Sequence, residues 1–236
     1  MPNRQRPAAN MVVCPEHLFC LQCFRTALRA YDPDDGELFE VSCRLDAVAS
    51  ILCAQCSQRN SHCDNAPAGI IGDFFDFALV LRFCKEFWTA ESDAGVARWD
   101  RNMLPLISLA VRNLAAALAS ILAGHRREHD LTQSRKKQGK ARQAYRHFCA
   151  ERRMALSPLP RPGRDGTPED LIAYHSARVL RLEPGDVGFT SWAAAKHACF
   201  AALRSAIVQF YGDEEVAGVE RLEEFDNYFP LVLDEI

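Results

Sequence analysis

Apolar residues recur at helical spacing along most of the chain after residue 70. The pattern is clearest over about 73–90, 102–124 and 191–211, where apolar positions repeat every three or four residues. Such residues lie on one face of a helix, and that face packs on a core. Alternation typical of half-buried strands is scarce in this part of the sequence. We therefore predict three long helices here, with Gly124 and Gly212 as stops, and an all-α body.

The pattern and the residues that interrupt it divide the chain into five segments. We predict a flexible tail over 1–13, a small Cys-rich zinc module over 14–68, and a helical domain over 69–156 that contains a basic helix at 125–153. A Pro- and Gly-rich linker covers 157–168, and C-terminal helices with an acidic end cover 169–236. Thr167 precedes Pro168, so we expect it to cap a helix that begins there. The predicted class is mainly α.

Length and composition fit an ordinary folded protein. The chain has 236 residues, with 48% hydrophobic and 25% charged residues and a net charge of −3, which suits one or two domains and excludes a wholly disordered chain. Residues 104–123 are long and apolar enough to span a membrane, but Arg112 and Asn113 lie at their middle, which favours a core helix. The first residues lack the apolar stretch of a secretion signal, so we expect a reducing compartment.

Cysteine is the one unusual feature of the composition. Seven of the ten cysteines fall between Cys14 and Cys63 and include two CxxC pairs, Cys20/Cys23 and Cys53/Cys56. Two such pairs can surround one zinc ion tetrahedrally, and thiolates favour zinc over magnesium or calcium. The first predicted site is therefore formed by these four cysteines.

A second ion has several candidate ligands. Cys43 and Cys63 could bind it, with a further ligand from Cys14, His17 or His62. Alternatively, bridging thiolates could share two ions among six cysteines. Buried thiols without metal, a redox-active CxxC and an iron–sulfur cluster are the remaining interpretations, although the βαβ context of the redox motif and the spacing of a ferredoxin are not seen.

The cysteine spacing resembles that of a known family. A CxxC pair, a lone cysteine and a final CxxC-x6-C over residues 14–68 look like a fungal cysteine-rich family of unknown function, and the end, Cys53 to Cys63, is similar to half of the fungal binuclear zinc cluster of transcription factors. The resemblance covers under a quarter of the chain and implies zinc binding and a fungal source. Nineteen residues separate Cys23 from Cys43, a longer insert than in the binuclear cluster, and this insert is acidic, which disfavours contact with phosphate.

Charge is distributed in two blocks of opposite sign. Ten cations and three anions between His125 and Arg153 give that segment a charge of +7. This segment is a candidate for contact with nucleic acid or for nuclear import, although a charged helix in solvent has the same composition. The candidate contact residues are Arg135, Lys136, Lys137, Lys140, Arg142 and Arg146. The acidic end, with its interleaved aromatic residues, could bind a protein partner or fold back as an amphipathic helix.

The motifs of common enzyme classes are missing from the sequence, and cysteines exceed the number that an open catalytic zinc needs. We therefore expect a non-enzymatic, zinc-binding regulatory or nucleic-acid-associated protein of fungal type, located in the nucleus and not in a membrane. The alternative is a protein–protein adaptor in which zinc is purely structural. The oligomeric state is left open by the sequence.

Overall fold

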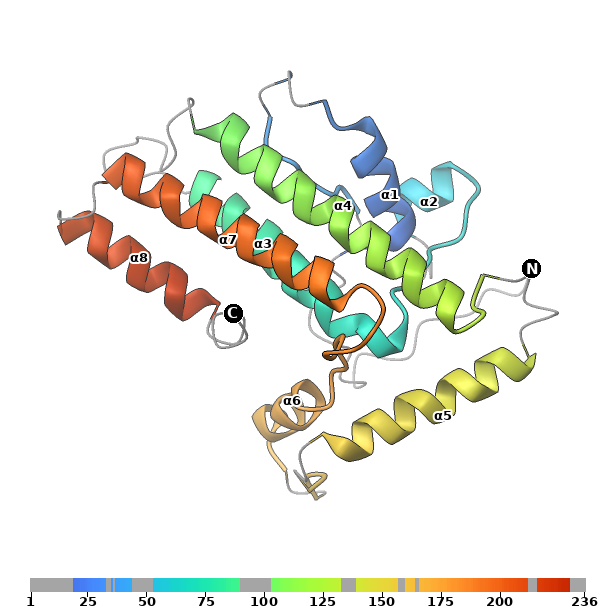
Figure 1. The fold of residues 1–236 in the computed structure, drawn as a ribbon. Coiled ribbons are helices and arrows are strands. Elements are labelled where there is room, and N and C mark those ends of the chain that lie inside the picture. Colours follow the sequence, from blue (N-terminus) through green and yellow to red (C-terminus); the bar gives the residue numbers. More distant parts are fainter. Residues whose placement is uncertain are drawn as a thin grey trace. The chain divides into compact units, whose positions relative to one another are not determined.

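The computed structural model describes residues 19–32, 35, 37–43, 53–89, 103–132, 139–156, 160–163, 166–211 and 216–229. Within these ranges the secondary structure is helical and contains no strand (Figure 1), which confirms the predicted mainly α class. The elements are α1 (Leu21–Ala30), α2 (Ala54–Gln58), the short 3-10 helix η2 (Ala68–Ile70), α3 (Ile71–Thr89), α4 (Leu104–Glu128), α5 (Gly139–Ala155), α6 (Pro168–Ser176), α7 (Phe189–Tyr211) and α8 (Val216–Tyr228).

Two boundaries differ from the sequence prediction. Gly124 lies inside α4, which ends instead at a left-handed turn where Asp130 has φ of 52°. The N–H groups of Asp130 and Leu131 donate to the carbonyls of Arg127 and Arg126, so the last turn of α4 is closed by a Schellman motif. The predicted basic helix 125–153 is consequently two segments, the end of α4 and the separate helix α5.

The chain divides into two compact units. Unit 1 comprises Met1–Asn65, Ala78–Ala116 and Ala194–Ile236, and it contains all the described cysteines of the Cys-rich segment. Within it, α8 lies beside α7, and α1 lies beside α2 (Figure 1). Phe83, Phe200, Phe225 and Phe229 are all buried and meet with ring centroids 5.0–5.9 Å apart, so the acidic last helix uses its aromatic residues for the core.

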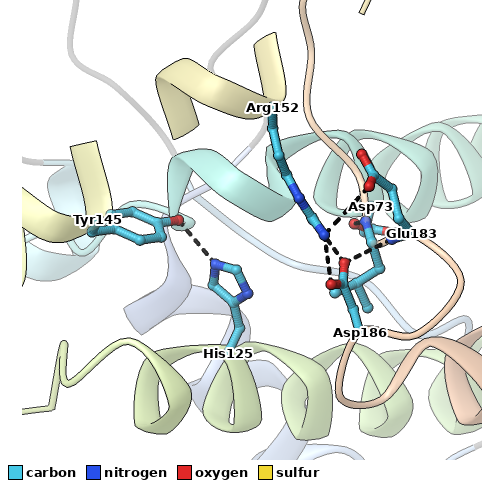
Figure 2. Close-up of polar contacts among 7 residues, drawn as sticks. Asp73, His125, Tyr145, Arg152, Glu183 and Asp186 are labelled. Carbon is cyan, nitrogen blue, oxygen red and sulfur yellow. Dashed lines mark hydrogen bonds and ion pairs between the residues drawn. The ribbon is translucent and has the colours of Figure 1, made fainter. Parts of the chain in front are cut away.

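Unit 2 comprises Ala66–Phe77 and Ala117–Ala193. Polar contacts connect its segments. Asp73, which is buried, accepts the backbone N–H of Leu182 at 2.9 Å, and half-buried Arg152 donates two hydrogen bonds to Asp186 at 2.5 and 2.7 Å (Figure 2). Helix α6 begins with a capping box in which Thr167 and Asp170 exchange hydrogen bonds, as predicted from Thr167 and Pro168. Tyr145 of α5 reaches η2, where its hydroxyl accepts the N–H of Gly69 at 2.7 Å.

Helix α4 is long and apolar enough to cross a membrane by length and composition, and no other helix of the described ranges is. A stripe of its residues is buried, including Ile107, Val111, Leu114 and Leu118. A core helix of a soluble protein has the same composition and the same stripe.

Candidate metal centre

Each CxxC pair begins a helix. Cys20 is the N-cap of α1, and its Sγ accepts the backbone N–H of Cys23 at 3.4 Å. Cys53 is the N-cap of α2 and accepts the N–H of Cys56 at 3.3 Å in the same way. A residue at the N-cap faces the residue three positions later, so this spacing turns both sulfurs of a pair to the same side. The helix starts therefore present two pairs of sulfur atoms.

The two pairs converge. Sγ of Cys20 lies 3.5 Å from Sγ of Cys56 and 4.0 Å from that of Cys53, and Sγ of Cys23 lies 3.5 Å from Sγ of Cys53. Sulfurs bound tetrahedrally to one zinc ion at 2.3 Å would lie about 3.8 Å apart. The separations in the structure therefore match those around a shared metal ion.

The sulfurs form two groups of four whose ligand atoms lie within 4.8 Å of one another. One group is Cys20, Cys23, Cys43 and Cys53, and the other is Cys20, Cys53, Cys56 and Cys63. The groups share Cys20 and Cys53, so the six cysteines form two overlapping groups of four with two common members.

This grouping is compatible with the alternative in which six cysteines share two ions, and it differs from the first site expected from the sequence. Cys23 and Cys56, which we placed on one ion, belong to different groups, and so do Cys43 and Cys63, which we placed together on a second ion. His62 is exposed and belongs to neither group. Cys14 and His17 lie outside the described residues.

The lone cysteines complete a symmetrical pattern of hydrogen bonds. The backbone N–H of Cys20 donates to Sγ of Cys43 at 3.4 Å, and the N–H of Cys53 donates to Sγ of Cys63 at 3.1 Å. Each of the two shared cysteines, Cys20 and Cys53, thus accepts a hydrogen bond from its own helix and donates its backbone N–H to a lone sulfur. Hydrogen bonds of this kind favour thiolates, which are the metal-binding form of cysteine.

The turn after α2 brings Cys63 back to the cluster. Asn60 has φ of 54°, and the N–H of Ser61 donates to the carbonyl of Cys56 at 2.9 Å, which closes α2 with a left-handed turn. The N–H of Leu21 then donates to the carbonyl of Asp64 at 2.7 Å, and the Arg25 guanidinium donates to the Asp64 carboxylate at 3.0 Å. These bonds attach the chain beside Cys63 to the start of α1.

The two shared cysteines are electrostatically distinct from the other four. Burial opposes ionisation of Cys20, but the N–H of Cys23 and the Cys56 side chain lower its pKa. Burial opposes ionisation of Cys53 likewise, yet the N–H of Cys56 and neighbouring thiols lower its pKa to about 6. Burial raises the pKa of the four remaining thiols, which are Cys23, Cys43, Cys56 and Cys63. The pKa of Cys43 is raised to about 12. The two central positions are thus the easiest to ionise.

The donor set fits a soft metal ion. Cys20, Cys23, Cys53 and Cys56 are buried, Cys43 and Cys63 are half-buried, and all six are free thiols. Six clustered sulfur atoms, four buried and two half-buried, without a carboxylate in either group of four, are a donor set for a thiophilic ion and not for calcium or magnesium. The cluster can therefore hold a metal ion.

The predicted nucleic-acid contacts lie partly on α5. Lys140, Arg142 and Arg146 are exposed on this helix, while Arg135, Lys136 and Lys137 lie outside the described residues. Arg142 and Arg146 are four residues apart and share a face, whereas Lys140 points to another face. Arg152, also on α5, is held by Asp186 and Glu183 and is not available to a ligand in this state.

One further group with metal-ligating side chains escaped the sequence analysis. His125, Glu128 and His129 at the end of α4 have ligand atoms within 4.8 Å of one another. The four-residue spacing of the two histidines was visible in the sequence, but the pair alone offered too few ligands. Glu128, directly before His129, was not considered as the third ligand.

No family model, curated protein or solved structure matches this chain.

Proposed function

We propose that the six-cysteine cluster binds two zinc ions bridged by Cys20 and Cys53. The observation that carries this proposal is the sharing of these two residues by both groups of four sulfurs. Each ion would have four thiolate ligands in a tetrahedral set, which is the preferred coordination of structural zinc. The resemblance to the fungal cysteine-rich family supports the same metal.

The zinc ions are proposed to be structural. Four cysteines around each ion leave no position open for water or substrate, and an open position is what a catalytic zinc needs. The helices around the cluster are also short, since α1 has ten residues and α2 has five, below the length at which isolated helices are stable. Zinc binding would therefore supply folding free energy to residues 14–68 and would support a non-enzymatic role.

For the whole chain we propose a nuclear regulatory protein of fungal type that associates with nucleic acid through α5. Exposed Arg142 and Arg146 on one face of α5 could contact neighbouring phosphates, with Lys140 and the cations at 135–137 adding charge. The zinc-binding lobe is a poorer candidate for phosphate contact, because the insert between Cys23 and Cys43 carries two arginines against five acidic residues.

Duplex DNA binding as a function of salt tests this role. About six phosphate contacts would give a slope of roughly −5 in log K against log salt, and replacing both Arg142 and Arg146 by Gln should reduce the slope by about 2. Lys85→Gln is a matched control, because Lys85 is an exposed cation of α3 that pairs with Glu40. Absence of binding at low salt, or equal slopes for all three proteins, would exclude the nucleic-acid role.

The second candidate is a protein–protein adaptor, and exposed leucines on α4 favour it. Leu106 is 57% exposed and Leu109 is 47% exposed, and their spacing of three residues places them on one face. Exposed acidic residues of α8, Glu220, Glu223 and Glu224, offer a second surface to a basic partner. A stable partner that is lost in Leu106→Glu, together with no affinity for DNA, would support the adaptor.

A further inference from the structure

The end of α4 carries two histidines and a glutamate outside the cysteine cluster. One ligand atom each from His125, Glu128 and His129 lie within 4.8 Å of one another, and the two imidazole centroids are 4.5 Å apart. His125 is buried, His129 is half-buried and Glu128 is exposed, so the group extends from the interior of unit 2 to its surface. An ion can reach such a group from solvent.

The backbone holds these residues at a defined helix end. The Schellman motif at Asp130 and Leu131 closes the helix directly after His129. All three side chains thus lie at the C-terminal end of the helix, where the helix dipole favours a cation. A metal ion would gain from this location in addition to its three ligands.

The imidazoles are also held from the side by α5. Nε2 of His125 lies 3.0 Å from the Tyr145 hydroxyl, as Figure 2 shows, and that hydroxyl accepts the N–H of Gly69. When Nε2–H of His125 donates to the Tyr145 hydroxyl, Nδ1 carries no proton and is able to bind metal. Metal-binding histidines usually donate their other ring N–H to a neighbouring acceptor in this way. The His129 ring lies 4.3 Å from Phe148 and 5.0 Å from Tyr145, so aromatic packing fixes its position.

Arg152 acts against positive charge on both histidines, but the nearby Asp186 carboxylate acts in the opposite direction. Arg152 lies on α5 with its guanidinium over the Phe148 ring, and it is paired with Asp186 and Glu183. Its charge is therefore balanced by two carboxylates (Figure 2).

We propose that His125, Glu128 and His129 bind one divalent transition-metal ion, independently of the cysteine cluster. Two imidazoles and one carboxylate are ligands of zinc, nickel and copper, whereas calcium and magnesium prefer oxygen ligands alone. The site shares no residue with the two cysteine groups, and its three protein ligands leave coordination positions for water or a ligand from a partner.

Equilibrium dialysis of the full-length protein against Ni²⁺ tests the site. Elemental analysis of the dialysed protein should find one nickel per chain, with no loss of zinc from the cysteine cluster. His129→Gln should weaken nickel binding by roughly tenfold or more, and Glu128→Gln should weaken it as well, with the zinc content unchanged in both. Since Glu128 is exposed, its variant decides the result even where His129→Gln fails to fold.

The matched control is His147→Gln, which removes an exposed histidine of α5. It should bind one nickel with wild-type affinity. The proposal is overturned when the wild-type protein binds no nickel or when Glu128→Gln binds nickel as well as wild type does. It is also overturned when His147→Gln loses nickel binding equally, or when nickel binds only by displacing zinc from the cysteine cluster, which Glu128→Gln also contains.

Discussion

Cys20 and Cys53 occupy equivalent positions although 33 residues separate them in the chain. Each caps the N-terminus of a helix, each accepts the N–H of the next cysteine in its CxxC pair, and each donates its own N–H to a lone cysteine. Their sulfurs are 4.0 Å apart, and they are the two residues common to both groups of four. On this equivalence we base the proposal of a two-ion cluster.

Removal of the proposed zinc ions should selectively unfold the Cys-rich lobe, residues 14–68. Because α1 and α2 are short and the centre of the lobe consists of thiols, a strong chelator should abolish amide protection over 19–30 and 53–64 while α7 keeps its protection. Hydrogen exchange followed by mass spectrometry measures this effect. Unchanged protection of α1 in metal-free protein would show that the lobe folds without metal.

Cys53→Ser should mimic this loss and destabilise the lobe by several kcal/mol, because Cys53 belongs to both groups. The control is Cys199→Ala, which removes a buried thiol of α7. That variant should keep its full metal content and lose only packing, at a cost of about 1–2 kcal/mol. Loss of metal in the control would contradict the assignment of Cys199 to the core.

The aromatic core of unit 1 should be sensitive to truncation. Phe225 contacts Phe83, Phe200 and Phe229, so Phe225→Ala should lower the free energy of unfolding by about 3–5 kcal/mol. Val219 lies on the same helix and is exposed, so Val219→Ala should change the stability by less than about 0.5 kcal/mol. Urea denaturation compares the two. Equal effects would mean that α8 is not packed as described.

Unit 2 should become less stable in acid, because protonation of Asp186 removes the contribution of its ion pair with Arg152. Burial alone would raise the pKa of Asp186, but its hydrogen bonds with Arg152 and with the N–H of Glu183 hold that pKa below its usual value. A carboxyl with a lowered pKa in the folded state stabilises the protein above its unfolded pKa of about 4 and loses that contribution as the pH falls further. The direction is therefore a loss of stability below about pH 4.

Asp186→Asn tests this dependence. At pH 7 the variant should open more easily than wild type by about 1–3 kcal/mol, because Arg152 loses its charged partner, and the difference should narrow below about pH 4. Amide exchange in α5 at several pH values measures it locally, apart from any effect of acid on the cysteine cluster. A difference that stays constant with pH would contradict the role of this pair.

Local features of the fold were predictable from the sequence, since they depend on neighbouring residues. Thr167 and Pro168 fix the start of α6, and each CxxC spacing fixes two sulfurs on one helix end. The stop of α4 was misplaced at Gly124, because the closing turn uses Asp130, a residue type that adopts positive φ less often than glycine.

The grouping of the six sulfurs was not predictable in the same way. It depends on the approach of α1 to α2 and on the positions of Cys43 and Cys63, which lie outside the helices. The packing of the two histidine rings at the end of α4 also depends on α5, where Tyr145 lies 20 residues from His125 in the sequence.

The number of zinc ions per chain, measured by elemental analysis of the purified protein and its variants, tests the central claim most directly. Bridging by Cys20 and Cys53 predicts two ions held by sulfur, one of which is lost in Cys43→Ser or Cys63→Ser and both in Cys53→Ser. Any additional zinc bound by His125 and His129 is identified by its loss in His129→Gln. A single sulfur-bound ion in the wild-type protein, or the same loss in all three cysteine variants, would contradict the shared-thiolate cluster.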